Sequence, residues 1–173
     1  MSVAPEIRTP AAGDVDAIAS LHVASWQETY RGLIDDSVLD DPTFIDRRRR
    51  YWATVTSSTS SSLRARIAID AGSIVGIALA GSPRDADATW DMELFVLYTD
   101  TRVHGTGIGA ALLNAAVPEA CSASLWVADP NPRAQAFYRK HGFAVDGVTK
   151  FDGVQEIRMV RRPSGGPHRA SVR

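Results

Sequence analysis

The chain has 173 residues, of which 45% are hydrophobic and 23% charged, and its formal net charge is −1 at pH 7. This length predicts one domain that buries about two-thirds of the surface of the unfolded chain. The near-neutral charge argues against a uniformly basic, nucleic-acid-binding surface. No apolar run approaches the ~20 residues that a membrane-spanning helix needs. The single cysteine, Cys121, excludes an internal disulfide and a cysteine-based metal cluster. Met1–Pro10 has no apolar segment behind a basic start, so we expect a cytoplasmic protein without a secretory signal.

The first third of the chain predicts a short extended segment followed by two helices. Glu6–Thr9 is the extended segment, and Asp14 is expected to cap a helix that Gly32 ends. Asp41-Pro42 predicts the start of a second helix, because proline is tolerated in the first helical turn. The hydroxyl-rich stretch Thr56–Ser62 predicts an exposed connection.

The middle of the chain changes from helical to extended periodicity. Arg66–Asp70 and Ser73–Ala80 predict two strands joined by a hairpin turn at Ala71-Gly72. Ala88–Thr99 predicts a longer strand, because it is rich in aromatic and branched residues. Gly107–Ala120 predicts a helix with an apolar face.

The remaining sequence alternates strands with one helix. The predicted elements are strands at Ser124–Val127, Phe143–Val148 and Val154–Val160, a helix at Pro132–His141 and a hairpin turn at Asp152-Gly153. The pattern predicts an α/β or α+β fold in which residues 1–162 form one domain with a mostly antiparallel sheet and inserted helices. Residues 163–173 contain too little apolar matter to pack and are predicted to be disordered.

A glycine-rich loop is the strongest local motif. His104–Ala110 reads H-G-T-G-I-G-A and lies between a predicted strand and a predicted helix. Glycines let the backbone approach a ligand closely, and the free N–H groups at a helix start bind anions. The loop therefore predicts a pyrophosphate site, although glycines that only let the helix pack tightly on the sheet would give the same pattern.

The loop alone leaves the kind of pyrophosphate ligand open. It contains G-x-G-x-x-A, and Asp129 lies twenty residues after Gly109, as in a dinucleotide site. Against an NAD site, the polar connector Asp100–His104 separates the strand from the first glycine. A P-loop is excluded because no Lys-Ser or Lys-Thr follows the glycines.

A second motif resolves this ambiguity. Asn131–Phe143 reads N-P-R-A-Q-A-F-Y-R-K-H-G-F. Together with Leu94–Gly109, it resembles the GCN5-related N-acetyltransferase (GNAT) family, and Trp26–Gly32 resembles its W-x-x-x-Y-x-G stretch. The likeness runs from Glu6 to Val160 and implies a central, mostly antiparallel mixed sheet flanked by helices. The sequence departs from the family pattern at His104, where Gln or Arg is usual.

The resemblance implies acetyl-CoA as co-substrate, and no metal cofactor is expected because the histidines lack the spacing of metal ligands. The strand backbone at Leu97, Tyr98 and Thr99 would then pair with the pantetheine arm, and Asn131 and Tyr138 would contact the coenzyme. The residues expected around the pyrophosphate are His104, Gly105, Thr106, Gly107, Ile108, Gly109 and Ala110. The histidines His22, His141 and His168 lack the spacing of metal ligands.

Acetyl transfer to an amine needs a proton acceptor for the amine and a proton donor for the departing thiolate. Glu93 is the candidate base, because it is a carboxylate within an apolar strand; a structural acid bonded to an arginine or to the backbone is the alternative. Tyr138 is the candidate acid, because a phenol is protonated at neutral pH; an amphipathic core residue is the alternative. Trp26 and Tyr30 are expected to line the acceptor channel beside Glu93.

We therefore predict an N-acetyltransferase (a transferase of the acyltransferase class) that acts by direct attack in a ternary complex. Met1–Asp46 holds nine acidic and two basic residues, which favours a small cationic amine or a peptide amine as the acceptor. A monomer or homodimer that binds neither nucleic acid nor membranes is expected. The alternatives are a non-catalytic acyl-CoA sensor and a dinucleotide-binding oxidoreductase.

Overall fold

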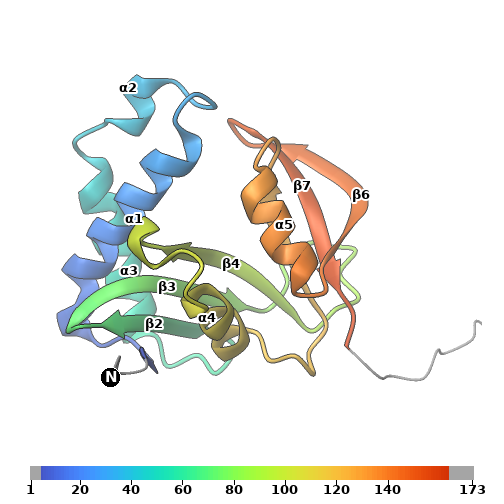
Figure 1. The fold of residues 1–173 in the computed structure, drawn as a ribbon, viewed down its shortest axis with the longest axis horizontal. Coiled ribbons are helices and arrows are strands. Elements are labelled where there is room, and N and C mark those ends of the chain that lie inside the picture. The colour runs from blue at the N-terminus through green and yellow to red at the C-terminus, as the bar shows by residue number, and fades with distance from the viewer. Residues whose placement is uncertain (1–4, 164–173) are drawn as a thin grey trace, which may run out of the picture.

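One seven-stranded sheet organises the chain in the computed structural model, which describes residues 5–163 (Figure 1). The strand order is β1-β2-β3-β4-β5-β7-β6. The strands are β1 (Glu6–Arg8), β2 (Arg64–Asp70), β3 (Ser73–Gly81), β4 (Met92–Thr99), β5 (Ala123–Ala128), β6 (Ala144–Phe151) and β7 (Gln155–Arg161). The helices are α1 (Val15–Tyr30), α2 (Asp36–Leu39), α3 (Phe44–Ser57), α4 (Ile108–Ala116) and α5 (Pro132–Lys140), with 3-10 turns η1 (Ala12–Asp14) and η2 (Thr101–Val103). Every neighbouring pair is antiparallel except β4 and β5. The predicted mixed, mostly antiparallel sheet with inserted helices is therefore confirmed.

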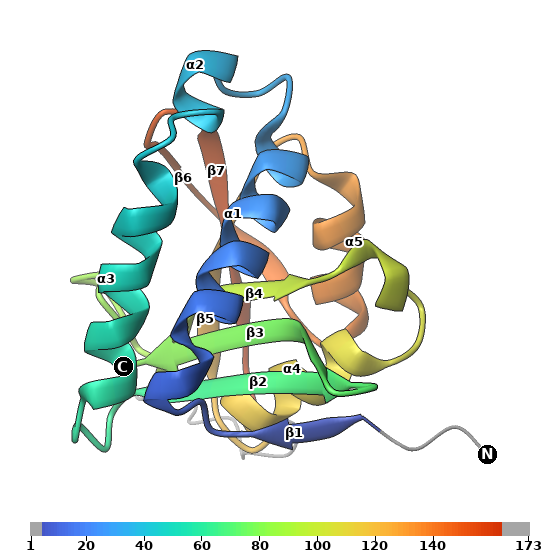
Figure 2. The same cartoon turned by 90° about the vertical axis from the view of Figure 1, so that its left-hand side faces the viewer.

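Helices cover both faces of the sheet and divide the core into two clusters. On one face, Ile18 of α1 and Trp52 of α3 pack with Ile77 of β3, and these two helices lie side by side in Figure 2. On the other face, Leu112 of α4 packs in a cluster with Met159 of β7, and α5 adds aromatic rings. The sheet therefore separates a face covered by α1 and α3 from a face covered by α4 and α5. No helix within residues 5–163 is long and apolar enough to cross a bilayer.

The two parallel strands at the centre of the sheet separate along their length. β4 pairs with β5 only where Met92–Leu94 faces Ala123–Leu125. Beyond that point, β4 continues along β3 to Thr99, and β5 continues along β7 to Ala128. The register of β3 and β4 shifts so that Phe95 has no residue opposite it. Such a bulge bends its strand, and here it lies where the two strands part.

Several element boundaries differ from the sequence prediction for identifiable reasons. The predicted strand Ala88–Thr99 begins only at Met92, because the preceding residues form a loop. The predicted helix Gly107–Ala120 ends at Ala116, close to Pro118, since the residue before a proline avoids helical geometry. Asp14 does not cap α1 with its side chain; its carboxylate accepts hydrogen bonds from Arg8 and from the Ala11 N–H instead.

Three further differences concern α3, α2 and β6. The helix predicted from Asp41-Pro42 begins at Phe44, and α2 was not predicted although Asp35 caps it by accepting from the Ser37 N–H. β6 extends to Phe151 rather than ending at Val148. The predicted disordered tail, apart from Pro163, lies outside the described residues.

A buried histidine joins α1 to α3. His22 is 4% exposed, and its Nδ1 accepts a hydrogen bond of 3.0 Å from the Trp52 indole N–H. Burial, with a smaller contribution from the charge of Arg48, lowers the pKa of His22 from 6.5 to about 3. His22 is therefore neutral in the folded protein at neutral and mildly acidic pH.

This histidine predicts a loss of stability in acid. Below pH 6.5 the unfolded chain binds a proton at His22 that the folded chain does not bind, so the free energy of unfolding falls as the pH drops from 6.5 towards 3. At pH 4.5 the expected loss from this residue is about 2–3 kcal/mol. Urea unfolding at pH 4.5, 5.5, 6.5 and 7.5 measures it. His22→Asn keeps a hydrogen-bond acceptor without the titration, so its stability should vary less across this range; parallel curves for both proteins would contradict the assignment.

Candidate active site

The gap between β4 and β5 opens into a cavity of about 710 Å³. On the face covered by α4 and α5, the cavity is lined by residues that include His104, Gly109, Asn131, Phe137 and Tyr138. On the face covered by α1, it is lined by residues that include Ser25, Glu28, Tyr30, Glu93 and Glu156. The cavity therefore runs through the sheet and connects its two faces. The structure brings most of the predicted site residues to this one place.

The backbone of β4 forms one wall of the cavity. From Phe95 to Thr99, no strand within residues 5–163 pairs with the side of β4 that faces β5. Leu97, Tyr98 and Thr99 line the cavity here. The backbone groups on this side of the strand are therefore open to an extended ligand, which would add to the sheet as another strand would.

The glycine loop lies at the end of β4. Gly105 and Gly107 adopt φ angles of +80° and +91°, which side chains rarely allow. The Thr106 hydroxyl donates a 2.7 Å hydrogen bond to the Val103 carbonyl and so closes the turn. The helix α4 starts directly after this loop, at Ile108, so the loop leads into its free N–H groups.

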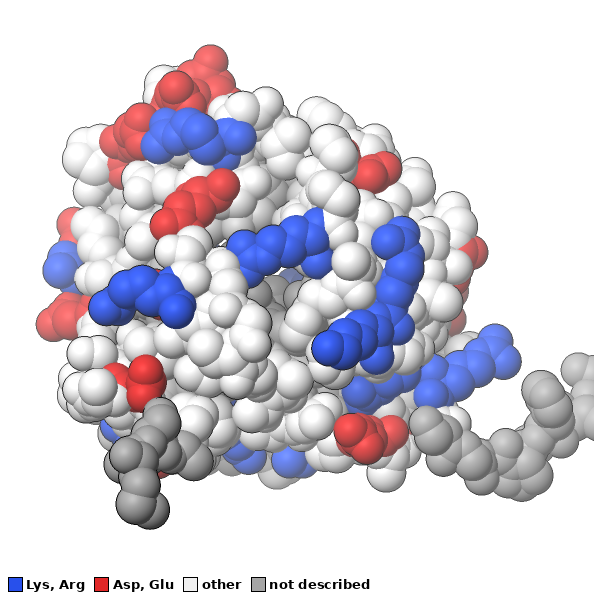
Figure 3. Space-filling model, viewed as in Figure 1, with Lys and Arg blue, Asp and Glu red and all other residues white. Residues whose placement is uncertain are grey.

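Basic side chains border this region of the surface. The face seen in Figure 3 is hollowed near its centre, between the glycine loop and α5 as placed in Figure 1, and Lys and Arg side chains lie beside the hollow. Acidic side chains gather instead over α2. This distribution suits an anionic group beside the loop.

His104 and Asn131 each make a structural contact within the chain. The His104 Nε2 lies 3.2 Å from the Thr99 carbonyl oxygen, so the ring holds the loop to the end of β4. The Asn131 side chain accepts a 3.1 Å hydrogen bond from the Ala134 N–H and caps α5. Both residues also line the cavity. Their predicted contacts with the coenzyme stay predictions, and Asn131 also has a structural role as the cap of α5.

Tyr138 of α5 lines the cavity and packs among other aromatic rings. Its ring lies 5.3 Å from that of Phe137 and 5.9 Å from that of Phe143. Burial raises the pKa of Tyr138 well above that of a free tyrosine, and the neighbouring Tyr30 adds to the shift. The hydroxyl is therefore protonated throughout the neutral range and can donate a proton or a hydrogen bond.

Glu93 lies at the base of the gap in close contact with one arginine. The side chain is 1% exposed, and its Oε2 accepts a 2.8 Å hydrogen bond from the Arg84 N–H. Its Oε1 accepts from the Nε and Nη2 of Arg84 at 3.1 and 2.6 Å. A carboxylate has about four lone-pair sites, so three donors leave Oε2 able to accept one more hydrogen bond. The predicted role of Glu93 as a base stays a prediction.

The two aromatic residues predicted for the acceptor channel differ in position. Tyr30 lines the cavity. Trp26 is not among the lining residues; its ring packs 4.5 Å from that of Phe44 and 5.4 Å from that of Tyr30. Trp26 therefore supports the wall that Tyr30 forms.

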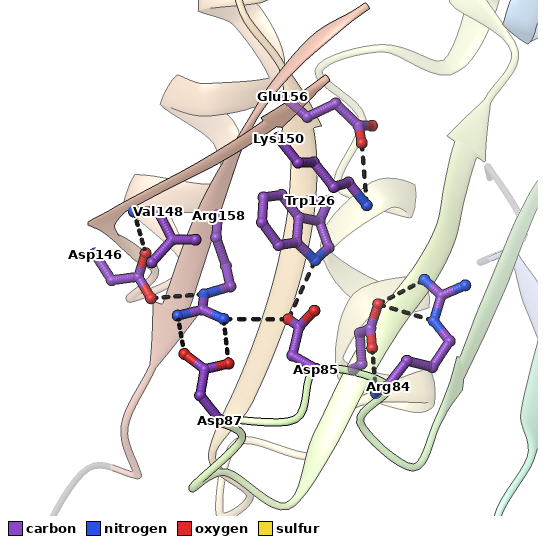
Figure 4. A network of polar contacts seen from close by, with 10 residues as sticks. Arg84, Asp85, Asp87, Trp126, Asp146, Val148, Lys150, Glu156 and Arg158 are labelled. Atoms are coloured by element: carbon purple, nitrogen blue, oxygen red, sulfur yellow. Dashed lines mark hydrogen bonds and ion pairs between the residues drawn. The ribbon is translucent and has the colours of Figure 1, made fainter. Parts of the chain in front are cut away.

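The sequence analysis missed a group of cavity residues on the last strands of the sheet. Trp126 of β5, Lys150 of β6 and Glu156 of β7 line the cavity on the face covered by α1. A sequence signal existed, because Glu156 and Arg158 alternate with apolar residues in a predicted strand and so share one face. Figure 4 shows these side chains together with Arg84. No group of three or more His, Cys, Asp or Glu residues that could hold a metal ion occurs in the part of the chain that the structure describes.

Comparisons with known proteins agree with this geometry. Residues 17–143 match the acetyltransferase (GNAT) family. A probable N-acetyltransferase of Mycobacterium tuberculosis is 30% identical over 152 residues, which cover 83% of each chain. The structure of the PaiA N-acetyltransferase from Thermoplasma acidophilum in complex with coenzyme A has a TM-score of 0.73 at 19% identity, covering 92% of this chain and 99% of that one.

A second structure leads to the same fold. The histone acetyltransferase HPA2 and related acetyltransferase from Corynebacterium glutamicum has a TM-score of 0.71 at 21% identity, covering 96% of this chain and 99% of that one. The family match spans most of the chain, and the fold and the glycine loop are those that the sequence resemblance implied. The chain therefore belongs to the acetyltransferase (GNAT) family, and the enzyme class predicted from the sequence, an acetyl-CoA-dependent N-acetyltransferase, is confirmed.

Proposed function

We propose that the enzyme transfers the acetyl group of acetyl-CoA to a primary amine by direct attack, with both substrates bound together. The observation that carries this proposal is the cavity that crosses the sheet between β4 and β5. A ligand on the side of α4 and α5 and an acceptor on the side of α1 would meet in this gap. Two substrates held in one geometry react without the entropic cost of a bimolecular encounter.

The wall on the side of α4 and α5 supports binding of the coenzyme. The open backbone of Leu97–Thr99 would hydrogen-bond to the amides of a pantetheine arm, and the N–H groups from Gly105 to Ala110 would hold a pyrophosphate. Bound there, acetyl-CoA supplies a thioester whose acetyl carbon reacts with an amine. Gly109 lines the cavity, and a Cβ added to it would lie 3.5 Å from the Phe137 ring, so a larger side chain there would fill space beside this wall.

The chain's own groups would manage the protons. Tyr138 would donate its proton to the departing sulfur, because it is protonated at neutral pH and lies in the wall of the cavity. Glu93 would accept the amine proton through a water bound at the remaining lone pair of Oε2, with Arg84 as a positioning residue. A backbone N–H of β4 near Leu97 would hydrogen-bond to the carbonyl oxygen as negative charge develops on it.

The charges around the cavity support a cationic acceptor. Glu28 on α1 and Asp152 on the turn between β6 and β7 line the cavity, and both are exposed. Of the other two acidic residues that line it, Glu93 is paired with Arg84 and Glu156 with Lys150. A small cationic amine or a peptide amine would gain favourable charge interactions at the side where it enters.

Ligand-induced stabilisation tests the coenzyme site. At a hundredfold excess over its Kd, acetyl-CoA should raise the stability by about 2.7 kcal/mol, which is about 5–10 °C in Tm for a chain of this size. NAD should not. Gly109→Leu should abolish the shift, because the new side chain would project beside Phe137 into the cavity. Gly13→Leu is the control, since no atom lies within 4 Å of its added Cβ; an equal shift with NAD, or an undiminished one in Gly109→Leu, would contradict the site.

Removing one hydroxyl tests the proton donor. Tyr138→Phe keeps the ring and its packing, so KM for acetyl-CoA should change little while kcat falls about 10²-fold or more. Release of the coenzyme A thiol with a panel of amines measures both constants. Tyr51→Phe on the exposed side of α3 is the control and should retain kcat. Coenzyme release by no amine, despite tight binding of acetyl-CoA, would favour a non-catalytic acyl-CoA sensor.

A matched pair of carboxylates tests the base. Glu93→Gln keeps the shape of the side chain but replaces an acceptor oxygen by an amide, so kcat should fall about 10²-fold if the group takes the amine proton. Glu28→Gln removes an exposed carboxylate of the same cavity and should mainly raise KM for a cationic amine. Steady-state kinetics of both variants separate the roles. Unchanged kcat in a folded Glu93→Gln protein would assign Glu93 a purely structural role.

A further inference from the structure

The enzyme contains only two lysines, Lys140 and Lys150, among its 19 basic residues. They lie in different surroundings. Lys140 is the last residue of α5, and its side chain is exposed. Lys150 of β6 lines the cavity that crosses the sheet. One primary amine of the chain itself is therefore already at the site where the proposed reaction consumes primary amines.

Two neighbours hold the amino group of Lys150. Its Nζ lies 3.2 Å from Oε2 of Glu156, the residue opposite it on β7. The same Nζ lies 4.2 Å from the centre of the Trp126 ring on β5. In Figure 4 the side chain runs from β6 across Trp126, and its amino group points toward β4. The long lysine side chain is thus directed from the edge of the sheet toward the gap.

A network of ion pairs around the buried Arg158 fixes the ring under Lys150. The Trp126 indole N–H donates a 3.2 Å hydrogen bond to Asp85. Asp85 is in turn 3.4 Å from Arg158, which is 4% exposed and also bonds to Asp87 and Asp146 (Figure 4). Because the guanidinium joins the β3–β4 loop to β6 and β7, Trp126 has a defined position. The direction of Lys150 is therefore set by packing as well as by charge.

The cavity residues around Lys150 extend as far as Tyr138, the proposed proton donor. The negative charge of Glu156 raises the pKa of Tyr30, and Tyr30 in turn raises that of Tyr138, although burial is the larger cause for both tyrosines. These effects require the groups to be near one another. Lys150, Glu156, Tyr30 and Tyr138 also line the same cavity. The Lys150 amine is carried on a flexible four-carbon side chain, so rotation about its bonds can move the amine toward these residues.

We propose that Lys150 is itself an acceptor and that the enzyme acetylates its own Lys150 Nζ. This rests on the proposed function, because it uses the same acetyl-CoA site. Glu156 takes one proton from the ammonium, and the neutral nitrogen forms a C–N bond to the thioester carbonyl carbon as the C–S bond breaks. Tyr138 donates a proton to the sulfur and is reprotonated from the nitrogen. The products are acetyllysine, the coenzyme A thiol and one proton released to solvent.

Acetylation would change the charge of the acceptor side. Lys150 would lose its positive charge, and the ion pair with Glu156 would be lost with it. The Glu156 carboxylate would then be free to receive another cation beside Trp126, whose ring face also attracts cations. The modification would therefore convert a site filled by the chain's own ammonium into one open to a cationic amine.

Mass spectrometry of the full-length protein tests the proposal without an external acceptor. The purified chain is incubated with acetyl-CoA, and its intact mass and its peptides are followed in time. One acetyl group should appear on Lys150 at a rate independent of protein concentration. Lys140, the internal control, should react at least about tenfold more slowly, because only Lys150 is held at the reacting centre. Lys150→Arg should remain unmodified, and Tyr138→Phe should slow the reaction at Lys150.

Each other outcome overturns the inference. Equal acetylation of both lysines, or the same rate in urea-unfolded protein, would indicate uncatalysed chemical acetylation. A rate proportional to protein concentration would indicate transfer between molecules. An unmodified Lys150 in an enzyme that acetylates an added amine would refute self-acetylation alone. An unmodified Lys150 together with no reaction of any amine in the panel would refute the proposed function as well.

Discussion

The site depends on an incomplete set of backbone hydrogen bonds between two neighbouring strands. Backbone N–H and C=O groups in a sheet interior are normally paired, and β4 and β5 pair for only three residues on each strand. The bulge at Phe95 bends β4 at that point, and Gly81 accommodates it, because a Cβ there would lie 2.7 Å from the Phe95 ring. A glycine on the neighbouring strand is thus part of what opens the cavity.

The charged residues near the site form ion pairs rather than a surplus of one sign. The chain is nearly neutral as a whole, yet three basic residues near the gap form ion pairs in which at least one member is largely buried. Arg84 holds Glu93, Lys150 holds Glu156, and Arg158 holds three aspartates. Removing one member of a buried pair leaves an uncompensated charge. These pairs therefore fix the positions of the side chains around the proposed acceptor side, and those of Arg158 connect the loop between β3 and β4 to the hairpin of β6 and β7.

Local sequence patterns predicted most elements and the residues of the proposed coenzyme side of the cavity. The glycine loop and the N-x-x-A-x-x-F-Y segment are each a single continuous stretch of sequence. Their positions could therefore be predicted once the strand and the two helices that flank them were assigned. The acceptor side could not be read in the same way, because Arg84, Trp126, Lys150 and Glu156 come from four separate segments. They meet only because β7 lies between β5 and β6 in the sheet. The alternation of residues along a single strand does not predict this strand order.

The position of Trp26 illustrates a second limit. Trp26 was expected to line the acceptor channel, but a short sequence motif does not distinguish a residue that faces a cavity from one that packs behind its wall. Its ring contacts Phe44 of α3, and α3 itself begins later than Asp41-Pro42 suggests. The short helix α2 was missed because four residues are too few to show a period.

The outer edge of β6 has a consequence for how molecules of this enzyme meet in solution. Within residues 5–163, no strand pairs with that edge, and Phe151 at its end is 76% exposed. An open edge of this kind invites strands of other molecules to add to it. However, the pairing with β7 is interrupted between Val145 and Thr149, where Gly147 has a φ of +91°. The irregular strand offers no continuous row of hydrogen-bonding groups, which protects the enzyme against edge-to-edge aggregation.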